Sequence, residues 1–248
     1  MTHPEYPPAI LSRAEPSDIP TLARIHVDAC APDLAISLYF TDKSQFAPLV
    51  AKMLREQVSD PAWVIVKATD VQSKQIAAWA SWKLVEHAEK TSPERKDGDP
   101  EMVGEREEKM VQSSASRPKG AFPFPAGLGS YVRANTDRVI RSWMADRKHI
   151  ILNGLFTDPL FQRRGIGTAL LCRSNEMADE RHWPCFLQGS PYAHKLYVAM
   201  GWKDVGFLDV DLKEWAPEAK EGERGWGNYR FWYMLRLPKG SKCTAAEE

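Results

Sequence analysis

The sequence predicts one mixed α/β domain, mainly because of the order in which its strand and helix patterns follow each other. At 248 residues the chain is long enough for one large domain or two small ones. Alternating apolar residues predict a strand at 9–13 and a hairpin of strands at 62–69 and 74–85. A strand–helix–strand–helix succession follows over 149–201. Paired strands joined to such a succession favour a single mixed sheet flanked by helices.

Apolar residues at helical spacing predict three helices in the first part of the chain. The first covers 15–30, with Ser17 as its N-cap, because a serine hydroxyl can accept a hydrogen bond from a free backbone N–H. The second covers 43–57, where Pro48 is expected to break or kink the helix. The third covers 131–148, and its expected core positions are Val132, Val139, Ile140 and Trp143.

The second part of the chain is predicted to alternate strands with helices and to end in two strands. One helix is expected to end near Arg181. The next is expected to have Pro191 at its first position and to close at Gly201. The expected elements are strand 149–157, helix 166–181, strand 185–190, helix 191–201 and strands 202–212 and 228–238.

A charge-rich segment, punctuated by proline and glycine, interrupts this pattern at 86–129. It holds few aliphatic residues, so it cannot bury enough apolar surface to offset the entropy lost on ordering. Two interpretations stay open, a solvated flexible insertion and a flap that covers a substrate. We therefore expect one domain over 1–240 that contains this insertion, followed by a frayed tail at 241–248.

Composition excludes several classes of function. Lys plus Arg and Asp plus Glu both total 33, so no net field attracts nucleic acid or membranes. No apolar run reaches about 18 residues and the first residues lack a signal pattern, so we expect a cytoplasmic protein. We expect it to be a monomer or a homodimer. The cysteines have no short metal-like spacing, so we expect no metal and a reducing compartment; they are Cys30, Cys172, Cys185 and Cys243.

The segment "QRRGIGT" at 162–168 has the properties of an anion-binding turn. It follows an apolar strand and opens a helix, whose first N–H groups are unpaired and lie at the positive end of the helix dipole. Gly165 and Gly167 have no Cβ, so a ligand can approach the backbone closely, and Arg163 and Arg164 add positive charge. These features indicate a site for a pyrophosphate-like anion. A glycine-tolerant turn with solvated arginines is the alternative.

Two motifs resemble those of the Gcn5-related N-acetyltransferase (GNAT) superfamily. "QRRGIGTALL" is similar to its [Q/R]-x-x-G-x-[G/A] signature, and "SPYAHKLYVAMGW" resembles its second motif with Ser190 in place of asparagine. "FLQGSP" resembles a strand end of fungal-type members. The resemblance is strong over 149–210 and loose over 9–85. It implies the GNAT fold, in which a mixed, mostly antiparallel central sheet contains a splayed parallel strand pair and is flanked by helices.

The resemblance also implies acetyl-CoA as co-substrate, held where the parallel strands 149–157 and 185–190 splay apart. It assigns the pantetheine arm to Ser190 and to the backbone of Leu155, Phe156 and Thr157. The serine side chain is shorter than asparagine, which leaves its contact open. For the pyrophosphate, the resemblance assigns the backbone of Gln162, Arg163, Arg164, Gly165, Ile166, Gly167 and Thr168.

Acetyl transfer to an amine needs a neutral amine, a polarised thioester carbonyl and a proton for the departing thiolate. Tyr197 falls on the general-acid position of the resembled family, and a phenol with a pKa of about 10 can donate that proton. A backbone N–H near Leu155 can polarise the carbonyl. The base stays open between a water relay and four side chains, which are His149, Asn153, Asp158 and His194.

Aromatic residues leave the acceptor pocket open. Tyr39 and Phe40 lie between the first two expected helices, in a loop that borders the acceptor site in the resembled family. Five tryptophans are spread over several elements and are more typical of a core than of an amine pocket; they are Trp79, Trp82, Trp143, Trp183 and Trp202.

We therefore expect an acetyl-CoA-dependent N-acetyltransferase. Its acceptor would be a primary amine of a small molecule or protein, attacking directly in a ternary complex. A non-catalytic acyl-CoA-binding or sensing protein on the same scaffold is the alternative, and a phosphate-binding structural domain is a more distant one.

Overall fold

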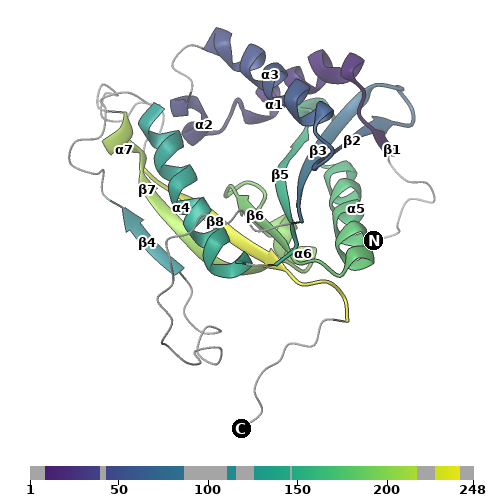
Figure 1. The fold of residues 1–248 in the computed structure, drawn as a ribbon. Coiled ribbons are helices and arrows are strands. Elements are labelled where there is room, and N and C mark those ends of the chain that lie inside the picture. Colours follow the sequence, from purple (N-terminus) through teal and green to yellow (C-terminus); the bar gives the residue numbers. More distant parts are fainter. Residues whose placement is uncertain are drawn as a thin grey trace.

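One sheet organises the part of the chain that the computed structural model describes, which comprises residues 9–39, 43–86, 111–115, 126–145, 147–216 and 227–240. Eight strands form it, in the order β1-β2-β3-β5-β6-β8-β7-β4 (Figure 1). Neighbouring strands run antiparallel, except that β5 is parallel to β6 and β4 is parallel to β7. The predicted mixed, mostly antiparallel sheet is therefore confirmed.

All the strands expected from the sequence are present. The strands are β1 Ala9–Arg13, β2 Trp63–Asp70, β3 Ile76–Val85, β4 Val111–Ala115, β5 His149–Thr157, β6 Cys185–Gly189, β7 Lys203–Asp211 and β8 Asn228–Arg236. β4 was not expected, because it lies inside the predicted insertion at 86–129. The rest of that segment lies largely outside the described residues, as does the tail at 241–248, so this division of the chain stays a prediction.

The helices differ from expectation mainly at their ends. They are α1 Ile19–Cys30, α2 Leu34–Tyr39, α3 Phe46–Ser59, α4 Ala126–Met144, α5 Ile166–Arg181, α6 His194–Ala199 and α7 Leu212–Trp215. The predicted N-cap at Ser17 is wrong, since a 3-10 turn over Pro16–Asp18 comes first and the Glu15 N–H donates to Asp18 Oδ2 at 2.7 Å. Pro48 does not break α3, because it lies in the first turn, where no N–H is required.

Two helix starts were also misplaced. α4 begins at Ala126 instead of 131. Pro191 is not the first residue of α6, because a separate turn precedes the helix at His194. Gly201 does close α6, and its φ of +85° is the left-handed conformation that a glycine tolerates best.

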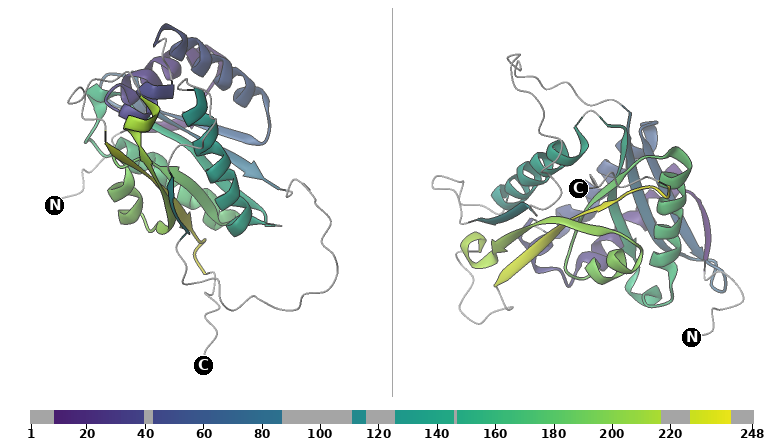
Figure 2. Two further views of the ribbon diagram at one scale, coloured as in Figure 1. Left: turned by 90° about the vertical axis from the view of Figure 1, so that its left-hand side faces the viewer. Right: turned by 90° about the horizontal axis from the view of Figure 1, so that it is seen from below.

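The helices cover the two faces of the sheet unequally. α5 and α6 pack on one face, over a core that includes Trp82, Ile150 and Leu187. On the other face α1 and α3 cover the β2–β3–β5 half, whereas α4 covers the half made by β6, β7 and β8 (Figure 2). The sheet thus has two halves, which meet at the β5–β6 pair.

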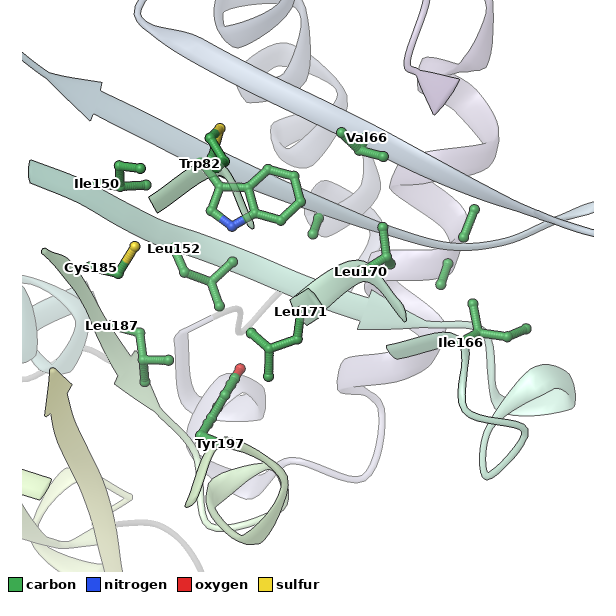
Figure 3. Packing of buried hydrophobic residues seen from close by; sticks show 14 of the residues in the cluster. Val66, Trp82, Ile150, Leu152, Ile166, Leu170, Leu171, Cys185, Leu187 and Tyr197 are labelled. Carbon is green, nitrogen blue, oxygen red and sulfur yellow. The ribbon is translucent and has the colours of Figure 1, made fainter. Parts of the chain in front are cut away.

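The tryptophans belong mostly to these cores, as their spread along the chain predicted. Trp79 and Trp82 are fully buried, and each indole N–H has a partner, Leu22 O at 2.9 Å and Ser174 Oγ at 2.8 Å. Figure 3 shows Trp82 packed among aliphatic side chains of β5 and α5. Trp202 is also buried, and Trp143 and Trp183 pack partly buried against the cores.

Candidate functional site

The parallel strands β5 and β6 separate after three residue pairs. Ile150, Ile151 and Leu152 pair with Cys185, Phe186 and Leu187, and no later residue of β5 pairs with β6. Beyond this point β5 pairs only with β3, and β6 pairs only with β8. A bulge marks the separation, since Asn153 has no partner in β3 while Leu152 and Gly154 do. The predicted splay is therefore present, and we call the opening between the two strands the wedge.

The register of β5 decides which of its backbone groups face the wedge. The Asp158 N–H donates to Ala77 O at 2.9 Å, so that pair is hydrogen-bonded. In an antiparallel ladder such pairs alternate, and Phe156 therefore bonds to β3. The N–H and C=O of Leu155 and Thr157 point the other way, into the wedge. Of the three strand residues assigned to the cofactor, Phe156 thus directs its backbone toward β3, and the assignments to the cofactor stay predictions.

The Phe156 side chain lies on the face of the sheet that α1 covers. Its ring stacks on His26 at a centroid distance of 3.7 Å and contacts Trp79 at 4.9 Å. A Cβ at Gly154 would lie only 2.5 Å from this ring. Gly154 is therefore a glycine because Phe156 folds back over it.

The turn before α5 lies at the end of β5 and leaves several N–H groups without helical partners. Arg163 has φ +63° and Gly165 has φ +80°, so two left-handed residues reverse the chain before the helix begins at Ile166. The Ala169 N–H makes the first bond to this turn, to Gly165 O at 3.0 Å. The N–H groups of the residues between them are free of helical partners. The turn therefore has N–H groups of the kind that an anion-binding turn needs, and its role in binding stays a prediction.

Side chains around this turn hold its shape. The Gln162 amide donates to Thr157 O at 3.2 Å, and the Arg164 guanidinium donates to Leu160 O at 2.9 Å. Arg163 and Arg164 are exposed. Buried Asp158 accepts from the Leu160 N–H at 3.0 Å and pairs with Arg24 at 2.8 Å. Because both of its oxygens are engaged, Asp158 is a structural residue and not the base.

Gly167 is not required by the packing of the protein itself. A Cβ there would lie 3.5 Å from Thr157 Oγ1 and 3.9 Å from Leu196 Cδ2, which are ordinary contact distances. Its φ is not among the positive values. The missing Cβ of this residue therefore matters only if another molecule approaches α5, which is what a bound diphosphate would do.

Tyr197 lies beside the wedge, on α6. Its side chain is 6% exposed, and burial raises the pKa of its hydroxyl above the ordinary value. A Cβ on Gly189 would lie 3.3 Å from its ring, so the ring packs against the end of β6. Figure 3 shows its hydroxyl directed toward Leu171. Ser190 follows β6 directly and is half-buried at the same end.

Two histidines were also candidates for the base that accepts the amine proton. His149 begins β5, at the paired end, and about 20 Å of strand separates it from Leu155. Its Nδ1 lies 2.7 Å from Arg147 O, and burial lowers its pKa, so its candidacy as the base is wrong. His194 Nε2 bonds to Asp204 at 2.9 Å and its ring stacks on Trp232.

Asn153 is exposed at the bulge, where its side chain can contact solvent or substrate. The Tyr39 side chain and Phe40 lie outside the described residues. Among the residues that are described, no cluster of three His, Cys, Asp or Glu could hold a metal ion. None of the described helices combines the length and hydrophobicity of a membrane span.

Two residues at the wedge were missed by sequence reasoning. Asp33 is buried and caps α2, because its Oδ1 accepts from the Ala35 N–H at 3.0 Å. An aspartate before an apolar run is a recognisable N-cap signal. Tyr192 donates its hydroxyl to Pro32 O at 3.1 Å, a contact across 160 positions that no local pattern could indicate.

Sequence comparison supports the resemblance to GNAT acetyltransferases independently of the structure. The acetyltransferase (GNAT) domain profile matches residues 130–209, the region that contains β5, the turn, α5, β6 and α6. An uncharacterized N-acetyltransferase of Schizosaccharomyces pombe is 44% identical over 65 residues, which are 25% of this chain and 28% of that protein. Residues 130–209 are therefore similar to a GNAT acetyltransferase domain. The match to the yeast relative spans little more than a quarter of that protein's length.

Solved structures of GNAT proteins share the fold at low sequence identity. Arylalkylamine N-acetyltransferase 2 from Aedes aegypti has a TM-score of 0.60 and 12% identity, over 92% of this chain and 98% of that chain. A protein described as histone acetyltransferase HPA2 and related acetyltransferase, from Corynebacterium glutamicum, has a TM-score of 0.53 and 17% identity, with coverages of 94% and 98%. At these identities the comparison supports a shared fold.

Proposed function

We propose that this protein is an acetyl-CoA-dependent N-acetyltransferase of the GNAT superfamily that acts on a primary amine of a small molecule or a protein. The observation that carries the proposal is the edge of β5 that faces the wedge. Leu155 directs its N–H and C=O into the wedge and Thr157 directs its N–H there, while the Thr157 C=O accepts from Gln162. This edge ends beside the turn at Gly165, where the first N–H groups of α5 have no helical partners. One extended molecule with amides at one end and phosphates at the other would use both features.

The fit to coenzyme A can be followed along the site. The pantetheine arm carries two amides, which can pair with this edge of β5 as an additional strand would. The diphosphate would accept hydrogen bonds from the N–H groups of Ile166, Gly167 and Thr168 and would lie at the positive end of α5. Exposed Arg163 and Arg164 add charge there. The Ser190 hydroxyl lies on the opposite strand and could reach the arm.

The chemistry would occur deep in the wedge, where the strands separate. The neutral amine attacks the thioester carbon, a C–N bond forms, and the C–S bond then breaks. The Leu155 N–H faces this space and would stabilise the oxyanion. Tyr197 would give its proton to the departing thiolate. Burial raises the pKa of Tyr197, so this phenol stays protonated before the reaction.

The proton of the amine requires a second acceptor. Asp158 and His149 are excluded by their positions and partners. A water that carries the proton to solvent is the path we propose, since Asn153 is exposed at the point of separation and can orient such a water. Free thiols at Cys30, Cys172 and Cys185 support a reducing compartment, and we propose the cytoplasm.

Two measurements test the proposal. Calorimetry should show binding of acetyl-CoA, and a thiol reagent should show CoA release with at least one of three amines: 2-phenylethylamine, spermidine or a lysine peptide. Binding without turnover across a broad amine panel would favour the non-catalytic acyl-CoA sensor. Absence of any binding would refute the cofactor site itself.

A further inference from the structure

The two halves of the sheet are joined at only one end of the wedge by strand pairing. Three residue pairs, Ile150–Leu152 with Cys185–Leu187, connect β5 to β6. α1 packs on β3 and β5 and so belongs to the first half. α6 follows β6 of the second half, and its Tyr197 packs in the core that α5 shares with β3 and β5. Whatever sets the width of the open end must therefore connect elements of different halves.

The turn between α1 and α2 makes two such connections. Tyr192, in the turn after β6, donates its hydroxyl to Pro32 O at 3.1 Å. The neighbouring Asp33 accepts from the Tyr229 hydroxyl of β8 at 2.7 Å. Chain separations of 160 and 196 residues show that both bonds join remote parts of the fold.

Both bonds lie at the open end of the wedge. Gly189 is the last residue of β6 and pairs with Trp232 of β8. Tyr192 comes three residues after Gly189. Tyr229 comes three residues before Trp232, and because β8 runs antiparallel to β6 it too lies beyond Gly189. In Figure 1 the α2 helix, which follows the turn, lies between α1 and α4, and it contacts α4.

The two connections differ in burial, which gives them different roles. Asp33 is 8% exposed, and it also accepts from the Ala35 and Ile36 N–H groups at 3.0 and 3.3 Å, so its bond to Tyr229 is part of a buried network. Tyr192 is 65% exposed and bonds to a single carbonyl. An exposed hydrogen bond exchanges readily with water, so the Tyr192–Pro32 bond can open while the buried Tyr229–Asp33 bond stays formed.

We propose that Tyr192 is a positioning residue whose bond to Pro32 clasps the α1–α2 turn across the open end of the wedge and retains the pantetheine arm. This inference rests on the proposed function, since it requires the arm to lie in the wedge. The arm would lie between the turn and α6. Opening of the clasp would precede release of the product CoA, and closing would follow entry of the next acetyl-CoA.

Tyr192→Phe is the test, because it removes only the hydroxyl. Stopped-flow dissociation of coenzyme A from the full chain should accelerate about 3- to 10-fold, the range expected for one exposed hydrogen bond. Hydrogen–deuterium exchange of the Ala35 and Ile36 amides should accelerate as well. The melting temperature should stay within about 1 °C, because the bond is at the surface.

Tyr229→Phe is the comparison variant, because it removes the other bond to the same turn. It leaves a buried oxygen of Asp33 without its donor and should therefore lower the melting temperature by several degrees. Unchanged CoA dissociation in Tyr192→Phe overturns the clasp, whether or not amide exchange changes. If the unaltered protein does not bind CoA, the proposed function fails first, and that outcome is seen before any variant is compared.

Discussion

Replacement of Gly167 by alanine is expected to change the stability of the protein and its affinity for acetyl-CoA in different directions. The new methyl group would meet Thr157 Oγ1 at 3.5 Å and Leu196 Cδ2 at 3.9 Å, so the protein can accommodate it. Alanine is favoured over glycine in a helix by up to about 1 kcal/mol. In a chain of this size, that gain raises the melting temperature by about 2–4 °C at most. Stability should therefore be unchanged or slightly higher.

Affinity for acetyl-CoA should change in the opposite direction. The methyl group would occupy the space through which a phosphate reaches the N–H groups at the start of α5. Loss of one charge-assisted hydrogen bond costs about 1.5–3 kcal/mol, which corresponds to a Kd roughly 10- to 150-fold higher by calorimetry. Gly129→Ala in α4 is the matched control, since it is the same substitution in another helix and its Cβ would meet nothing within 4 Å. Equal affinity in Gly167→Ala and Gly129→Ala would refute the placement of the diphosphate.

Three further predictions concern other parts of the site. Tyr197→Phe should lower kcat about 100-fold or more while the KM for acetyl-CoA stays within about 2-fold, and unchanged turnover would remove its role as acid. His26 has a pKa lowered to about 3 by burial, below its ordinary 6.5, so its neutral form stabilises the fold above pH 6.5 and that stability is lost as pH falls toward 3. Urea denaturation should show that the free energy of unfolding falls between pH 7.5 and pH 5 by about 2 kcal/mol less in His26→Phe than in the unaltered protein. Equal decreases in the two proteins would contradict this cause. Gly154→Ala should cost about 1–3 kcal/mol through its clash with Phe156, and less in a Phe156→Leu background; equal costs in both backgrounds would show that the ring is not the reason.

Local sequence signals were sufficient for the elements that carry the site. β5 was predicted at its observed bounds because a mainly apolar run stops shortly before Pro159. The start of α5 followed from the glycines and the basic turn before it. Gly201 was predicted to close α6 because glycine adopts a positive φ without strain.

Features that depend on pairing across the fold could not be predicted. The bulge at Asn153 decides that Leu155, and not Phe156, directs its backbone into the wedge, and this bulge exists only in the register with β3. β4 pairs with β7 about 95 positions along the chain, from within a segment whose composition predicts no strand. The Tyr192–Pro32 bond likewise arises from tertiary contact alone.

The most direct test of cofactor placement is an amide chemical-shift titration of the isotope-labelled protein with coenzyme A. The account predicts the largest shifts at Leu155 and Thr157 and at Ile166 to Thr168, with Phe156 changing less because its N–H stays bonded to β3. Shifts concentrated away from the wedge, with these amides unmoved, would contradict it.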